Sequence, residues 1–416
     1  MKDSRRGPGF VALVFLLACL ANSRTLPREG YEALNDVRNI NRALASTPHF
    51  RDTLTWWTGP LAHDGIRDYR PLASYLFWIE RKLFGDAYER YLLAGWLLFG
   101  TWCALTFVLI LRMQIGELFA LAGASILLLP WYWNTDPQEL DWLAWFPGHP
   151  VPLCGLLMIA ALLAFDVWLA RSRPHWLVGA CVGAAGAMLT WGGAITLPGM
   201  VALLAWHRSS APLRRRVAGV IAVGVAVGVV LALRAHFVPG ARGPVVNLKL
   251  LHKLAIHATG QFTLYLSSGS HWPALLALAI AGWGVLCGRV ASLVARFGVL
   301  LSLTAVAVTL GGESPMVALV TLLDFNRENA VRTDVIYMTL WVWSTVLLWR
   351  RRRELPIVAA YGMVLLSLLP GAQYTGWHYR LIPLAFWALV YALNFQAWWD
   401  WLSSSVRLSR RSTRAD

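Results

Sequence analysis

Long apolar runs separated by short arginine clusters are the feature of this sequence that most constrains its fold. The 416-residue chain is 57% hydrophobic and only 14% charged, whereas a soluble domain carries about 25% charged residues. Many of the runs approach the roughly 20 residues that an α-helix needs to cross a bilayer. Backbone groups in lipid must bond within their own segment, so such runs predict helices. We therefore predict an all-α polytopic membrane protein.

The basic residues give the expected topology. A formal charge of +15 is compatible with a nucleic-acid partner, but the cations fall in short clusters between apolar runs, as they do in loops held on the cytoplasmic side. We therefore predict no nucleic-acid partner and two cytoplasmic termini. High Ala, Arg and Trp usage is typical of GC-rich bacteria, which predicts a multi-pass protein of the cell inner membrane. The clusters lie at 5–6, 171–173, 214–216, 350–353 and 407–414.

The runs and clusters together predict about twelve spans in one membrane domain, residues 1–400, followed by a basic cytoplasmic tail, 401–416. The stretch 176–207 is interpreted as two helices, because "TWGGAITLPG" at 190–199 favours a chain reversal. That reversal keeps all the clusters on one side. The expected spans are 8–23, 91–112, 115–134, 149–170, 176–190, 194–207, 217–236, 272–288, 296–311, 335–349, 355–371 and 381–399.

The polar segments that mix acids, histidine, aromatics and arginine all fall on the non-cytoplasmic face in this topology. The longest is the first outer loop, 24–90. Within it, residues 71–84 open with a proline, which suits the first turn of a helix, and their apolar residues are interrupted by Glu80, Arg81 and Lys82. This predicts an amphipathic helix lying flat in the membrane interface. The other mixed segments are 135–150, 237–271, 312–334 and 372–380.

Asp36 lies in "NDVRN", a few residues beyond the first span. A carboxylate there is expected just above the membrane surface, where it can contact a polar acceptor while a lipid-borne donor approaches from the bilayer. The alternative is that Asp36 caps the helix that follows, since Asn and Asp are good N-caps.

The order of an early span, an acidic residue soon after it and then "YRPL" at 69–72 resembles the membrane glycosyltransferases of the GT-C fold. Among them it is most similar to the transmembrane O-mannosyltransferases that carry tetratricopeptide repeats and to their bacterial relatives. "DPQELDWLAWFPGHP" at 136–150 and "HYRLIPL" at 378–384 resemble two later motifs of that group. The chain departs from the group at Asn35, where a first acid is expected, and in lacking the repeats. The first departure leaves an altered or lost activity open.

The resemblance implies an enzyme that takes a sugar from a polyprenyl-phosphate-type donor on the periplasmic face and passes it to a glycan, lipid or protein acceptor. Such an enzyme needs a carboxylate general base. Asp36 is the candidate base, and Glu139 is the second acid, which orients the acceptor or shares the proton. The alternative for Glu139 is a solvated loop acid.

In an enzyme of this kind the leaving group is a lipid phosphate, whose growing negative charge needs cations where water is scarce. The preference for cations in cytoplasmic loops does not explain arginine on the non-cytoplasmic face. Cations on that face are therefore candidates for this role. Arg380 lies immediately before the last span; its alternative role is that of an interfacial arginine. The candidate phosphate ligands are Arg327, Arg332, His378, Tyr379 and Arg380.

The charges before "YRPL" are expected to form the acceptor side of the site. Tyr69 and Arg70 belong to this loop, and Arg70 is expected to tie it to a carboxylate. Asp64 and Asp68 are candidate partners of Arg70 rather than candidate bases.

The sequence predicts no particular cofactor. No cluster of His, Cys or Asp has metal-ligand spacing, so no metal ligands are assigned, although a divalent cation remains possible because some GT-C enzymes use one. Three other functions stay open: a transporter or flippase of a lipid-linked or amphiphilic substrate, a polymerase of lipid-linked oligosaccharides, and a scaffold. Few charges fall in mid-span, which disfavours ion-coupled transport.

Overall fold

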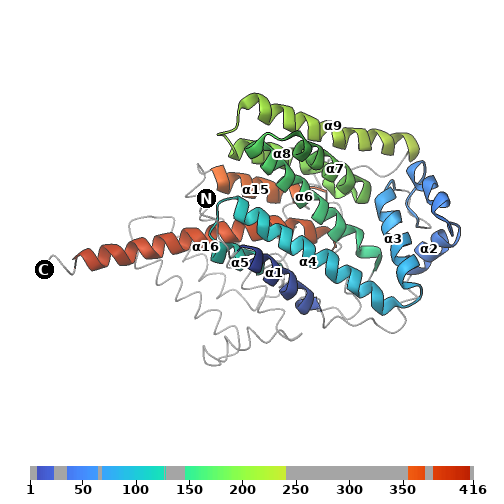
Figure 1. Ribbon diagram of the computed structural model, residues 1–416, viewed down its shortest axis with the longest axis horizontal. Coiled ribbons are helices and arrows are strands. Elements are labelled where there is room, and N and C mark those ends of the chain that lie inside the picture. Colours follow the sequence, from blue (N-terminus) through green and yellow to red (C-terminus); the bar gives the residue numbers. More distant parts are fainter. Residues whose placement is uncertain are drawn as a thin grey trace, which may run out of the picture.

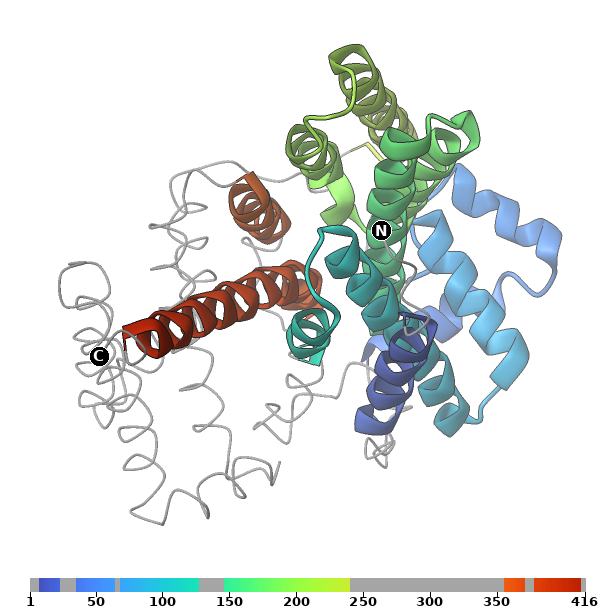
Figure 2. The same cartoon turned by 60° about the vertical axis from the view of Figure 1, so that its left-hand side comes forward.

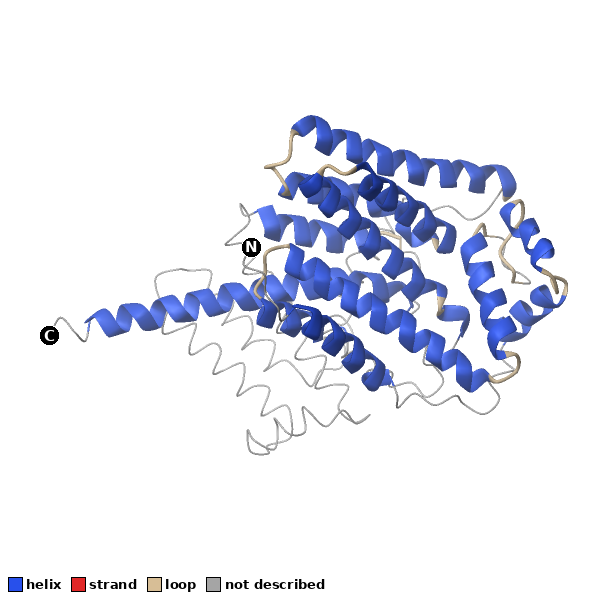
Figure 3. Cartoon of the chain, viewed as in Figure 1, coloured by secondary structure: helices blue, strands red, loops and turns tan. Residues whose placement is uncertain are grey.

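The computed structural model describes residues 7–22, 35–63, 68–125, 127, 146–239, 355–370 and 378–412. This part of the chain is mostly helical and contains no strand (Figure 3). The prediction of an all-α fold is confirmed for it. The spans expected at 272–288, 296–311 and 335–349 lie outside the described residues, as does most of the second half of the span expected at 115–134, of which α5 (Glu117–Ser125) is described.

Three helices in the described part are long and apolar enough to cross a membrane. They are α4 (Tyr88–Arg112), α6 (Pro150–Arg171) with the short 3₁₀ helix η4 (Phe146–Gly148) before it, and α9 (Leu213–Phe237). Shorter apolar helices accompany them. These are α1 (Gly7–Asn22), α8 (Leu197–His207), α15 (Leu355–Leu368) and the first part of α16 (His378–Ser412). This composition is compatible with a membrane-embedded protein.

Helices α6, α7 (Pro174–Thr190), α8 and α9 run alternately in opposite directions. The chain turns between α7 and α8 through the 3₁₀ helix η5 (Gly192–Thr196), so the chain reversal predicted at 190–199 is confirmed. Helix α7 packs on α6 and α9, while α8 packs on α9 and α15 (Figure 1). Helix α16 lies against α15 and α5, and its last turns extend away from the rest of the described chain (Figure 2).

Side-chain contacts identify the two ends of this bundle. At one end Asp166, near the end of α6, binds Arg112 at the end of α4 and Arg208 just after α8. At the other end Arg234, near the end of α9, binds Asp68. We call these the Asp166 end and, after the nearby acid considered below, the Asp36 end.

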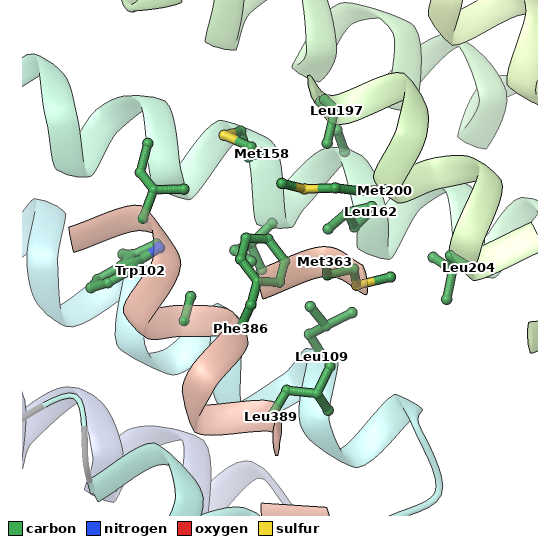
Figure 4. Close-up of a cluster of buried hydrophobic side chains, with 14 of the residues drawn as sticks. Trp102, Leu109, Met158, Leu162, Leu197, Met200, Leu204, Met363, Phe386 and Leu389 are labelled. Carbon is green, nitrogen blue, oxygen red and sulfur yellow. The ribbon is translucent and has the colours of Figure 1, made fainter. Parts of the chain in front are cut away.

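The centre of the bundle is a continuous apolar core. Trp102, Met158 and Phe386 come from α4, α6 and α16 and are almost fully buried, and their side chains gather around the same region (Figure 4). A glycine permits close approach of α5 to α16. A Cβ at Gly123 of α5 would lie 2.5 Å from the Ala388 oxygen of α16. Burying large aromatic and sulfur side chains at this density is what holds the helices in one arrangement.

Two features differ from the sequence-based expectation. Helix α16 runs to Ser412, beyond the span expected to end at 399, so its backbone continues into the predicted tail without a break. Helix α3 (Pro71–Phe84) begins and ends where predicted, but Glu80, which interrupts its apolar residues beside Arg81 and Lys82, is only 2% exposed.

Candidate functional site

A layer of short helices covers the Asp36 end of the bundle. It consists of α2 (Asn35–Ala45), the 3₁₀ helix η2 (Phe50–Trp57) and α3, which lie at the right-hand side of Figure 1. We call this the end layer. It has an apolar core of its own, separate from that of the bundle, in which Ile40, Trp56 and Phe77 are buried against Phe146 at the start of η4. The polar groups of the candidate site are therefore held on a packed support.

Hydrogen bonds hold the described residues between η2 and α3. The Leu61 amide donates to the Asp68 carbonyl at 2.6 Å, and the Ala62 amide donates to the Ser74 hydroxyl at 2.9 Å. The Tyr69 hydroxyl donates to the Trp57 carbonyl at 3.0 Å. These bonds define the position of the next residue, His63, in the folded chain.

Asp36 and His63 meet at the edge of the end layer. His63 Nε2 lies 3.3 Å from Asp36 Oδ1, and the His63 side chain is 6% exposed whereas that of Asp36 is 45% exposed. The histidine thus holds one carboxylate oxygen from the buried side. Among the described residues Asp36 Oδ2 has no hydrogen-bond partner, so the open side of the carboxylate is available to a ligand.

The helix-cap alternative for Asp36 is not supported by these contacts. Helix α2 begins at Asn35, so Asp36 is its second residue, and its carboxylate contacts His63 rather than an amide of the first turn in the described chain. A negative charge in a first turn is still favourable for the helix dipole.

Asp68 joins the end layer to the bundle. Its Oδ2 lies 2.6 Å from Arg70 Nη2 and its Oδ1 lies 3.1 Å from Arg234 Nη2. Asp68 Oδ1 also accepts from the Tyr69 amide at 2.8 Å. The ion pair expected between Arg70 and a nearby carboxylate is present, with Asp68 as the partner. The second arginine, from α9, was not predicted.

Tyr69 supports this connection. Its ring is stacked on Phe237 at the end of α9, with 6.2 Å between ring centroids, and burial raises the pKa of its hydroxyl. Together, Tyr69 and Asp68 attach the start of α3 to the last turn of α9. In the described chain these residues act as structural ties beside Asp36.

Glu80 and His149 form a second connection, which is fully buried. His149 Nδ1 lies 2.7 Å from Glu80 Oε1, and the two side chains are 0% and 3% exposed. Burial raises the pKa of Glu80, and the neighbouring His149 opposes part of that rise. Because His149 directly precedes α6, this pair ties α3 to the end of the segment that carries Glu139.

Of the remaining predicted site residues, the structure describes only those at the start of α16. Asp64, Glu139, Arg327 and Arg332 lie outside the described residues. His378, Tyr379 and Arg380 form the first turn of α16. The Gly116 amide, near the Asp166 end, donates to Gln396 further along α16 at 3.0 Å, so the first turn of α16 points toward the Asp36 end.

No group of three His, Cys, Asp or Glu side chains that could hold a metal ion is found within the described ranges. The described site is instead a half-exposed carboxylate with a histidine behind it, next to an arginine-rich ion-pair cluster. Such an arrangement can accept a proton and orient a polar acceptor group. Sequence reasoning missed His63, Glu80, His149 and Arg234, and only the mixed polarity of the segments around 63 and 149 offered a signal for them.

Comparison with protein-family models, curated proteins and solved structures finds no match to this chain.

Proposed function

We propose that this chain is a polytopic inner-membrane glycosyltransferase that moves a sugar from a polyprenyl-phosphate-type donor to an acceptor on the periplasmic face. In this proposal the Asp36 end faces the periplasm, the Asp166 end faces the cytoplasm, and about twelve spans of a GT-C-like fold surround the site. The observation that carries the proposal is the half-exposed Asp36 carboxylate, held from behind by the buried His63.

The proposed reaction requires one base and one stabilised leaving group. The acceptor hydroxyl loses its proton to Asp36 Oδ2 as its oxygen attacks the anomeric carbon, and the bond from that carbon to the phosphate oxygen breaks. The polyprenyl phosphate leaves with the bonding electrons. A positioned general base contributes about 10²- to 10⁴-fold to such a step.

His63 gives Asp36 a defined orientation in this mechanism. A carboxylate free to rotate presents its basic oxygen to the acceptor only part of the time, so fixing it lowers the entropy cost of reaching the transition state. The proton that Asp36 takes up can then pass to water through its exposed side. Glu139 is assigned the second acidic role, of orienting the acceptor or sharing the proton.

The phosphate of the donor is assigned to cations of the later loops. Arg380, with His378 and Tyr379, opens the helix that points toward the Asp36 end, and Arg327 and Arg332 belong to a mixed polar segment of the sequence. A guanidinium can bind phosphate in bidentate fashion and stabilises its growing negative charge.

The proposal is tested by measuring the cellular level of the lipid-linked donor. In a strain that lacks the gene, mass spectrometry of total lipid extracts is expected to show one sugar-linked polyprenyl phosphate accumulating at least severalfold. Wild type or Glu89→Gln, which alters another exposed acid at the same end, restores the normal level, whereas Asp36→Asn does not. Unchanged donor levels in the deletion strain, or full restoration by Asp36→Asn, would overturn the proposal.

A further inference from the structure

The Asp166 end carries a concentration of arginine that the proposed reaction does not use. Two turns lie there, between α6 and α7 and between α8 and α9. Within 166–175, 205–217 and the last residue of α4, Asp166 is the only acid. The arginines are Arg112, Arg171, Arg173, Arg208, Arg214, Arg215 and Arg216.

Asp166 neutralises only part of this charge. It is 1% exposed, and its Oδ2 and Oδ1 lie 2.6 Å from Arg112 Nη2 and Arg208 Nε. Both carboxylate oxygens are occupied by these two guanidinium groups. The other five arginines therefore have no carboxylate partner among residues 166–175 and 205–217.

Two of those five are held in place by the backbone of neighbouring helices. Arg215 Nη1 donates to the Leu169 carbonyl at 3.2 Å, and Arg216 Nη1 donates to the Ala205 carbonyl at 3.4 Å. These bonds bring the start of α9 against the last turns of α6 and α8. Arg171, Arg173 and Arg214 are exposed and lie within a few residues of these contacts in the sequence.

An apolar track leads from this position along α9. Leu213, Val217, Ile221, Val225 and Val229 recur every four residues and are 65%, 47%, 59%, 59% and 53% exposed. Residues four apart are neighbours on a helix surface, so these side chains form a continuous track that winds slowly around α9. Trp206, 46% exposed, lies at the same end of the neighbouring α8, where an indole typically marks the interface between lipid and water.

We propose that the two turns form a binding site for an anionic phospholipid. The phosphate headgroup lies among Arg171, Arg173 and Arg214, and the acyl chains follow the apolar track of α9. Cations beside an exposed apolar face match the two chemical parts of such a lipid.

The test uses the full-length protein purified in neutral detergent, with phosphatidylglycerol or phosphatidylcholine of the same acyl chains added. Binding is followed by native mass spectrometry and by the shift in Tm. Phosphatidylglycerol is expected to bind at least about tenfold more tightly than phosphatidylcholine and to raise Tm further. The triple variant Arg171→Gln/Arg173→Gln/Arg214→Gln is expected to lose this preference while remaining folded, because all three side chains are exposed.

The matched control removes the same charge from the other end. Arg42→Gln/Arg51→Gln/Arg90→Gln changes three exposed arginines of the end layer and of the start of α4, and it is expected to keep the preference for phosphatidylglycerol. If both triple variants lose the preference for phosphatidylglycerol equally, the attraction is an unspecific effect of positive charge, and the proposed site is wrong. Equal affinity for both lipids in wild type, or full stabilisation by inorganic phosphate alone, would overturn it as well.

Discussion

Asp36 Oδ1 lies 3.3 Å from His63 Nε2 although the two residues are 27 positions apart in the sequence. The histidine is buried and the carboxylate is half exposed. One face of Asp36 is thereby fixed by the protein, and the other is open to a ligand. This asymmetry distinguishes Asp36 from a surface acid, and it underlies the role of base that we propose for it.

Replacing His63 is expected to impair turnover more than donor binding. In His63→Ala the Asp36 carboxylate is still present but is no longer oriented, so kcat should fall roughly 10- to 100-fold while KM for the lipid donor changes little. Membranes from complemented cells provide the assay, and His175→Ala, at an exposed histidine of the Asp166 end, is the control. A higher KM with normal kcat would assign His63 to donor binding instead.

Removing the charge of Asp68 is expected to destabilise the fold. In Asp68→Asn, Arg70 and Arg234 lose their shared carboxylate and are left repelling each other, at a cost of about 2 kcal/mol. Asp86→Asn is the control, because Asp86 pairs with Arg81 while its own side chain is 81% exposed, and such pairs contribute little. We expect the Tm in detergent to fall for Asp68→Asn and to stay unchanged for Asp86→Asn. Equal shifts in Tm would contradict the structural role of Asp68.

Because Glu80 is buried, we expect it to make the stability of the fold depend on pH, and burial determines the direction of that dependence. Because burial raises its pKa in the folded protein, the folded state holds the Glu80 proton more tightly than the unfolded chain does. The stabilisation is therefore greatest below the ordinary glutamate pKa of 4.5 and is lost as pH rises through the raised value. The Tm of wild type relative to Glu80→Gln should fall as pH rises from about 4; a rise over that range would contradict the assignment.

Two of the glycines of α9, Gly219 and Gly224, should respond differently to the same substitution. A Cβ at Gly219 would overlap the Trp168 ring and lie 2.6 Å from Phe165 Cε2, whereas a Cβ at Gly224 would meet nothing within 4 Å. Gly219→Ala should cost about 1–3 kcal/mol through overpacking, while Gly224→Ala should leave stability unchanged or slightly improved. Thermal unfolding of the two variants in parallel tests this; tolerance at Gly219 would mean that α9 packs less closely on α6.

Features with a local signal were predicted well from the sequence. Helix α3 begins at Pro71 and ends at Phe84, as its amphipathic pattern and first-turn proline indicated. The reversal at η5 follows from the Gly-Gly and Leu-Pro pairs. Both depend on residues within a few positions of each other, so backbone preference alone identifies them.

Features that depend on distant partners were not predictable in the same way. Glu80 meets His149 across 69 positions, and Asp68 meets Arg234 through the packing of α9 against the end layer. No periodic pattern marks either partner, because the pairing depends on which helix ends the fold brings together. Glu80 stands beside Arg81 and Lys82 in the sequence, and nothing in that local pattern indicates that it is buried.

The most direct test of the central claim is a cell-surface glycan profile of a deletion strain complemented with wild type, Asp36→Asn, Arg380→Ala or the control Glu89→Gln. We expect the deletion to remove one sugar from a lipopolysaccharide, wall polymer or glycoprotein. Wild type and Glu89→Gln should restore it, whereas Asp36→Asn and Arg380→Ala should not. A deletion that changes no glycan would contradict the claim that this chain is a glycosyltransferase and would favour a transporter, and full restoration by Asp36→Asn would contradict the role of Asp36 as the base.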